Sequence, residues 1–171
     1  MELSRDFKLP DGLESLSAIY QDLAPMAAGL MMGQRHRIAN AANLSALIYD
    51  ALPDLNWVGF YFIEPDPTDG GKPVLMVGPF QGKPACVRIE IGQGVCGSAV
   101  AQVATQRVAD VHAFEGHIAC DPASRSELVV PLVVDGVIGV LDIDSPLPNR
   151  FSSEDQAGIE YLASLYIQSI A

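Results

Sequence analysis

Positive charge is scarce in this sequence. It has 10 lysines and arginines against 21 aspartates and glutamates, which gives a formal net charge of −11 at pH 7. Proteins that bind nucleic acids carry a basic patch or stripe, and anionic membrane surfaces attract basic segments. The most basic cluster is the pair Arg35 and Arg37. We therefore expect neither a nucleic-acid partner nor a membrane partner.

Long apolar runs and a secretory leader are also missing. No run approaches the ~18 apolar residues needed to span a bilayer. Residues 1–6 lack the basic stretch that opens a signal peptide. We therefore expect a cytoplasmic protein, in a compartment that keeps thiols reduced. The count of 3 cysteines is odd, which does not suit the disulfide framework of a secreted protein.

The composition is that of one folded domain. The chain has 171 residues, 49% of them hydrophobic and 18% charged, so we assign residues 1–171 to a single domain. Apolar residues at helical spacing predict helices at about 13–32 and 35–52, and Pro25 should kink or divide the first. These helices should pack on a sheet-containing core at about residues 55–170.

Beyond the second helix the pattern changes to short strands. Turn signals and residue types predict a short helix at 95–102, a final helix after residue 152, and strands at 57–63, 73–77, 87–91, 107–109, 127–134 and 137–143. Tight turns such as Asp135-Gly136 favour antiparallel pairing, and the fold class is α+β. Residues 110–126 fit neither period, and so long an irregular segment is usually functional or disordered.

The three cysteines lie in the middle third of the chain. Cys86, Cys96 and Cys120 can be small buried apolar residues, as free cysteines often are. Cys120 lies in the irregular segment, which favours exposure, and Cys96 lies near a predicted helix N-terminus, where the dipole favours a thiolate. Clustered thiols in a reducing compartment suit redox chemistry, in which one thiol is oxidised and a second resolves it as a disulfide.

A zinc site is an alternative interpretation of the same region. His112, His117 and the cysteines would supply enough ligands. Structural zinc, however, favours paired close spacings, and here only His117-x-x-Cys120 is tight. We therefore expect no metal.

Three acids and two aromatic residues accompany the cysteines. Glu127 opens the strand after the irregular segment, and Asp142 and Asp144 are two residues apart on one strand, so their carboxylates share a face. Such like charges repel, which raises at least one pKa unless a cation, such as a substrate ammonium, lies between them. Trp57 and Tyr61 share a face of the first strand and suit a small apolar group such as an S-methyl. Solvated acids and a plain aromatic core are the structural alternatives.

Several motifs together resemble those of the free methionine-(R)-sulfoxide reductases, a family with the GAF fold. They are GPFQGKPAC at 78–86, GVCG at 94–97, DVHAF at 110–114, GHIACD at 116–121, SRSE at 124–127 and VIGVLDIDS at 137–145. The resemblance implies a central antiparallel six-stranded sheet flanked by helices, and an enzyme that reduces free methionine sulfoxide. It also implies a homodimer and no cofactor beyond an external thiol reductant of the thioredoxin type.

The resemblance implies roles for single residues as well. Cys120 matches the catalytic cysteine, Cys86 the main resolving cysteine and Cys96 an auxiliary one. The three acids match those that hold the amino group and the sulfoxide, and Trp57 matches the aromatic residue that meets the methyl group. Which of Cys86 and Cys96 resolves first, and which acid protonates the sulfoxide oxygen, stay open. The alternative function is a non-catalytic GAF module that binds a small ligand or senses oxidants.

Overall fold

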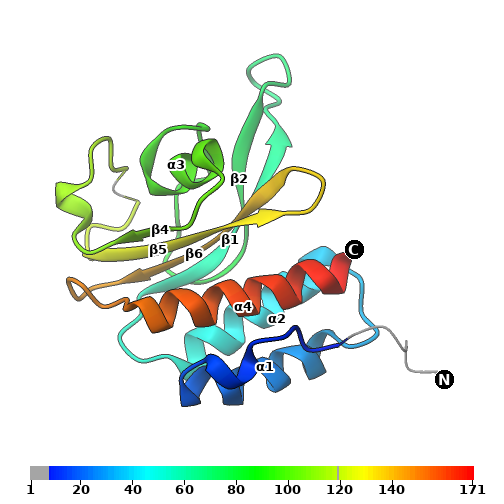
Figure 1. Cartoon of the computed structure of the whole chain (residues 1–171). Helices are drawn as coiled ribbons and strands as arrows, with labels where there is room; N and C mark the ends of the chain where they lie inside the picture. The colour runs from blue at the N-terminus through cyan, green and yellow to red at the C-terminus, as the bar shows by residue number, and fades with distance from the viewer. Residues whose placement is uncertain (1–7, 119) are drawn as a thin grey trace.

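The helices gather mainly on one side of the molecule. The computed structural model describes residues 8–118 and 120–171. Its helices are η1 Leu13–Ser15, α1 Ala18–Met31, α2 Arg37–Ala51, α3 Gly94–Gln102, η2 Val111–Ala113 and α4 Ser153–Ile170, with η denoting a 3-10 helix. Figure 1 shows α1, α2 and α4 together below the sheet and α3 on its other side. No helix in the described ranges is long and apolar enough to cross a membrane.

The strands of the described chain form one antiparallel sheet. They are β1 Trp57–Pro65, β2 Pro73–Gly82, β3 Arg88–Ile89, β4 Gln106–Val108, β5 Ser126–Val133 and β6 Val137–Ser145. Their spatial order is β3-β2-β1-β6-β5-β4, and each neighbouring pair is antiparallel. The α+β class and the six-stranded sheet are thereby confirmed. The pairing of β1 with β6 joins the two hairpins at the centre of the sheet.

The sheet separates two apolar cores. Alternate residues of a strand point to opposite faces. Accordingly, β1 contributes Phe60 to the large core under α1, α2 and α4. The same strand contributes Trp57 and Tyr61 to a smaller core on the other face, which α3 covers with Cys96. Every residue singled out for its chemistry on β1, α3, β5 and β6 therefore points away from the three-helix layer.

Pro25 does not divide the first helix, contrary to one of the two outcomes predicted for it. α1 runs unbroken over Ala18–Met31, and the break in the helical segment falls earlier, at Ser17, whose backbone is extended. Proline removes one backbone hydrogen bond. Ala24 and Ala28, on the buried face of α1, lie in the large core. Tertiary packing thus holds the helix together around the proline.

The strand predicted to end at Val77 is longer than expected. β2 continues through a glycine and a proline to Gly82. Its pairing with β1 shifts register between Gly59 and Tyr61, and this irregularity accommodates the extra residues. A bulge of this kind is missed from sequence because glycine and proline are typical of turns.

Gly158 on α4 provides a test of this packing. A Cβ there would lie 2.2 Å from the ring of Tyr20, which is buried and donates a hydrogen bond to Asp155. Gly158→Ala should therefore lower the free energy of unfolding by about 1–3 kcal/mol through overpacking. Gly29→Ala on α1 is the matched control, because a Cβ there meets nothing within 4 Å. It should raise stability by roughly 0.5–1 kcal/mol. Urea unfolding curves measure both, and equal effects would contradict this account.

Candidate active site

A cavity opens on the face of the sheet that α3 covers. Its volume is about 40 Å³, which exceeds the roughly 10–15 Å³ that one water needs. Seven of the residues predicted from the sequence line it: Trp57, Tyr61, Cys96, Cys120, Glu127, Asp142 and Asp144. The eighth, Cys86, is bonded to Cys120. The structure thus brings all eight predicted site residues to one place.

The register of the central strands positions the acids. In the β5–β6 pair Glu127 lies opposite Asp144, and in the β1–β6 pair Asp144 lies opposite Trp57. Asp142 lies opposite Gly59, where a Cβ would lie 2.5 Å from the Trp57 ring. Glycine is required at this position because Phe80 Cβ, at 2.3 Å, and the indole of Trp57 occupy the space that a side chain would need. The three acids and the aromatic wall therefore share one face of three adjacent strands.

Cys86 and Cys120 form a disulfide. They are 34 residues apart in sequence, and their Cα atoms lie 5.3 Å apart. Cys86 lies between β2 and β3, and Cys120 lies in the irregular segment between β4 and β5. The bond ties these two segments together at the cavity. It is the pairing that the resemblance implied, and it leaves Cys96 as the free cysteine.

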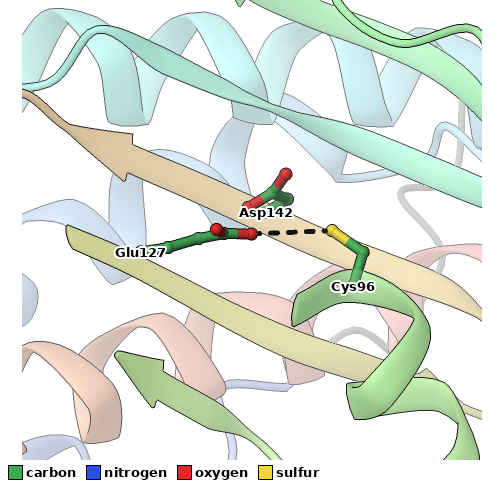
Figure 2. Close-up of side chains that lie close together, drawn as sticks. All are labelled: Cys96, Glu127 and Asp142. Atoms are coloured by element: carbon green, nitrogen blue, oxygen red, sulfur yellow. Dashed lines mark hydrogen bonds between the residues drawn. The ribbon is translucent and has the colours of Figure 1, made fainter. Parts of the chain in front are cut away.

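Of the two interpretations open for Cys96, the structure supports a buried, packed thiol and not a thiolate at the helix N-terminus. Cys96 lies in the first turn of α3, but its thiol is buried and its Sγ is 3.9 Å from Oε1 of Glu127 (Figure 2). Burial, and then the charges of Asp142 and Glu127, raise the pKa of this thiol well above its usual value. Desolvation and nearby carboxylates therefore outweigh the helix dipole here.

The acids themselves resist ionisation. Burial is the largest cause in each case, and the neighbouring carboxyl groups add to it for Glu127 and Asp144, whose pKa values are raised well above normal. Burial raises the pKa of Asp142 from 3.8 to about 6. The predicted repulsion between carboxylates on one face is confirmed. The pocket therefore favours the protonated form of these carboxyl groups more than water does.

The two aromatic residues form a wall of the cavity. The ring centroids of Trp57 and Tyr61 are 5.7 Å apart. The Tyr61 hydroxyl donates a 2.9 Å hydrogen bond to the backbone carbonyl of Cys86. Tyr61 thus links β1 directly to the segment that carries one half of the disulfide.

Asn56 and Ser124 are polar contributors that the sequence analysis missed. The Asn56 side-chain amide donates 3.0 Å hydrogen bonds to Asp121 Oδ2 and to Ser124 Oγ, and its backbone N–H donates to the Asp144 carbonyl. Asp121 directly follows Cys120, so Asn56 fastens the cysteine-bearing segment to the end of β6. No periodicity or motif distinguishes this asparagine from an ordinary turn residue.

His117 and Cys120, the closely spaced pair of the alternative zinc interpretation, have other partners in the structure. Cys120 is in the disulfide, and His117 Nε2 lies 4.0 Å from Oε2 of Glu127. Burial, followed by the neighbouring His112, lowers the pKa of His117, which favours a neutral ring. A different set has metal-binding geometry: one ligand atom each from Cys96, Glu127 and Asp142 lies within 4.8 Å of the others.

Comparison with known proteins places the chain in a family. A GAF domain family model matches residues 39–171. The free methionine-R-sulfoxide reductase of Escherichia coli (strain K12) is 53% identical over 146 residues, which are 85% of this chain and 84% of that protein. The chain belongs to the GAF-domain family of free methionine-R-sulfoxide reductases.

Solved structures of this reductase family match the whole fold. The fRMsr of Staphylococcus aureus in its reduced form is 48% identical, with a TM-score of 0.83, over 89% of this chain and 95% of that one. The free methionine-R-sulfoxide reductase of Neisseria meningitidis, solved in complex with its substrate, is 38% identical with a TM-score of 0.82. That match covers 96% of this chain and 93% of the Neisseria chain.

The buried acids of the reductase pocket make stability depend on pH. In the unfolded chain the carboxyl group of Asp142 ionises near its ordinary pKa. In the folded protein its pKa is about 6, so it stays protonated to a higher pH. The stability that this carboxyl contributes is therefore fully present below about pH 4 and is lost as the pH rises through 6. Ionisation in the folded state should lower the free energy of unfolding by on the order of 3 kcal/mol.

Denaturant unfolding of the disulfide form at a series of pH values tests this. The wild type should lose stability between about pH 4 and pH 7, by on the order of 3 kcal/mol, and ionisation of Asp142 should cause no further loss above that range. Asp142→Asn should flatten that part of the profile, because the amide does not ionise. Parallel profiles for the two proteins would show that Asp142 ionises as easily in the folded state as in the unfolded state.

Proposed function

We propose that this protein reduces free L-methionine-(R)-sulfoxide to methionine, with Cys120 as nucleophile and Cys86 as the resolving thiol. The observation that carries the proposal is the Cys86–Cys120 disulfide beside a cavity lined by acids and aromatic rings. A disulfide is the oxidised product that such a reaction leaves on the enzyme. The E. coli and Neisseria relatives bear this activity in their names.

The reaction proceeds through two sulfur steps. The Cys120 thiolate attacks the sulfur of the sulfoxide, and the oxygen is protonated and passes to Cys120, which leaves methionine and a Cys120 sulfenic acid. The Cys86 thiol then attacks the sulfenic sulfur, so the disulfide forms and water departs. A dithiol reductant reopens the disulfide by exchange. In total, one sulfoxide and two reducing thiols give methionine, one disulfide and water.

Two carboxyl groups can supply the proton for the sulfoxide oxygen. A carboxylic acid with a raised pKa stays neutral near pH 7 and can donate a proton there. Glu127 and Asp144 are the candidates for this role, because burial and neighbouring carboxylates raise their pKa values. Asp142, with a pKa of about 6, is ionised at neutral pH and is our choice, with its neighbours, for the substrate ammonium.

The remaining groups of the pocket select the substrate. Trp57 and Tyr61 line the apolar side, where the S-methyl group would pack. Backbone N–H groups of the irregular segment would hold the carboxylate. A pocket that binds both the ammonium and the carboxylate excludes methionine sulfoxide inside a peptide chain, so the substrate is the free amino acid.

A dithiol of the thioredoxin type is the proposed reductant, and a homodimer is the proposed assembly. The dimer has support from α1, whose Ile19, Met26 and Leu30 are exposed at spacings of seven and four residues, which places them on one helical face. The cytoplasmic location stays a prediction. Sedimentation equilibrium decides between monomer and dimer.

The first test is direct. Reduced protein is mixed separately with the R and S epimers of free L-methionine sulfoxide and with dithiothreitol, and methionine is quantified. Methionine should form from the R epimer alone, and an oxidised peptide should not be turned over. Cys120→Ser should abolish the reaction, and it serves as the control for direct reduction by dithiothreitol. No methionine from either epimer would favour a ligand-binding or redox-sensing GAF domain instead.

The second test concerns the resolving thiol. With thioredoxin, its reductase and NADPH as the reducing system, Cys86→Ser should form about one methionine per active site and then stall, because Cys120 cannot complete its disulfide. Rapid-quench counting of methionine measures the burst. Full steady-state turnover in Cys86→Ser, with a stall only in the double variant that also carries Cys96→Ser, would move the resolving role to Cys96.

A further inference from the structure

Three side chains with metal-binding atoms meet at one side of the cavity. Cys96 comes from α3, Glu127 from β5 and Asp142 from β6, and their ligand atoms all lie within 4.8 Å of one another (Figure 2). The Cys96 Sγ lies 3.9 Å from Oε1 of Glu127. The three residues come from distant parts of the chain, and they converge because the sheet register and the cover by α3 bring them together.

The distance between Cys96 Sγ and Glu127 Oε1 is close to that of two ligand atoms on one tetrahedral divalent cation. Zinc binds thiolate sulfur at about 2.3 Å and carboxylate oxygen at about 2.0–2.2 Å, so two ligand atoms on one ion lie roughly 3.5 Å apart. The observed sulfur–oxygen distance needs only a small contraction. Three protein ligands with a fourth position facing a water-sized cavity match the arrangement of open zinc sites. A thiolate in the set favours zinc or cadmium over magnesium or calcium.

A second observation points to a missing cationic partner. Asp142 is 5% exposed, Glu127 is 6% exposed and Cys96 is 3% exposed. The Oδ1 atom of Asp142 is buried and has no hydrogen-bond partner among the described residues. The Asp142 carboxyl group has hydrogen bonds with Cys96, Glu127 and the backbone of Ile143, but its Oδ1 atom is left to take a cation, because a buried carboxylate oxygen is stabilised by an opposite charge or a hydrogen bond. No lysine or arginine lines the described part of this cavity.

We propose that Cys96, Glu127 and Asp142 bind one thiophilic divalent cation, Zn²⁺ in preference to Mg²⁺ or Ca²⁺, and that the bound ion excludes the substrate. On binding, the Cys96 thiol releases its proton to water and its sulfur bonds the ion, with no change of oxidation state. The ion occupies the place that the proposed function gives to the substrate ammonium. Only the exclusion of substrate depends on that function, and the binding of the ion does not.

The disulfide form of the protein isolates the proposed site. All three cysteines lie in the described part of the chain, and with Cys86 bonded to Cys120 the one remaining thiol is Cys96. Titration of this form with Cd²⁺ should produce the ultraviolet absorption of a thiolate–cadmium bond, which saturates at one ion per chain. Added Zn²⁺ should remove the band by displacement, and Mg²⁺ should not. Absence of the band would overturn the proposal without any variant.

Variants then assign the ligands. Cys96→Ser should abolish the band, and Asp142→Asn or Glu127→Gln should weaken Cd²⁺ binding by at least roughly tenfold, the lower end of what even an outer partner contributes to a metal site. Glu115→Gln is the matched control, since Glu115 is exposed and lies in the same segment as His117. A band that survives in Cys96→Ser, or a loss in Glu115→Gln equal to that in Glu127→Gln, would also overturn the proposal.

Competition separates this site from the proposed function. Free methionine, the product, should raise the apparent Kd of Cd²⁺ if it occupies the same acids. Glycyl-methionine, in which a peptide bond blocks the methionine amino group, should not. Tight Cd²⁺ binding in a protein that fails to reduce methionine sulfoxide would count against the proposed function alone. Reduction of the sulfoxide with no Cd²⁺ binding would count against the metal site alone.

Discussion

The antiparallel register of β5, β6 and β1 is the constraint on which the site depends. It places Glu127 beside Asp144 and Asp144 beside Trp57, and it leaves the carboxyl groups of Glu127 and Asp142 buried on the face that α3 covers. A slip of one residue would turn every one of these side chains to the opposite face, into the large apolar core. The apolar residues Leu128, Leu141 and Ile143, which alternate with the acids and fill that core, therefore fix the site as firmly as they fix the fold.

Side-chain hydrogen bonds help to position the cysteine-bearing segments. Neither Cys86 nor Cys120 lies in a helix or strand, and each is tied to the sheet by a side-chain hydrogen bond: Tyr61 holds the Cys86 carbonyl, and Asn56 holds Asp121. This division suits a redox cycle. The acids must stay fixed on the sheet, whereas the sulfurs must approach one another to bond and separate to admit the substrate.

Sequence periodicity predicted what depends on strand parity. The shared face of Trp57 and Tyr61 and that of Asp142 and Asp144 follow from a two-residue repeat, and both are confirmed. The sequence left open whether Cys96 is a thiolate or a packed thiol, because burial by residues distant in the chain decides that pKa. Asn56 was missed for the same reason, since its partners at residues 121 and 124 are brought to it only by the folded chain.

The buried acids also explain why the chain needs cysteines in two kinds of environment. Burial, and then the neighbouring carboxyl groups, raise the pKa of Cys96 and favour the protonated thiol, which is a poor nucleophile. A nucleophile for a substrate bound at those acids must therefore come from elsewhere, and Cys120 lines the cavity from the irregular segment. The cost of burying three acids falls when a cation enters, whether it is a substrate ammonium or a metal ion. Carboxyl groups that attract a substrate ammonium also attract a metal ion, because both are cations. Cys96 adds the sulfur that a thiophilic ion prefers.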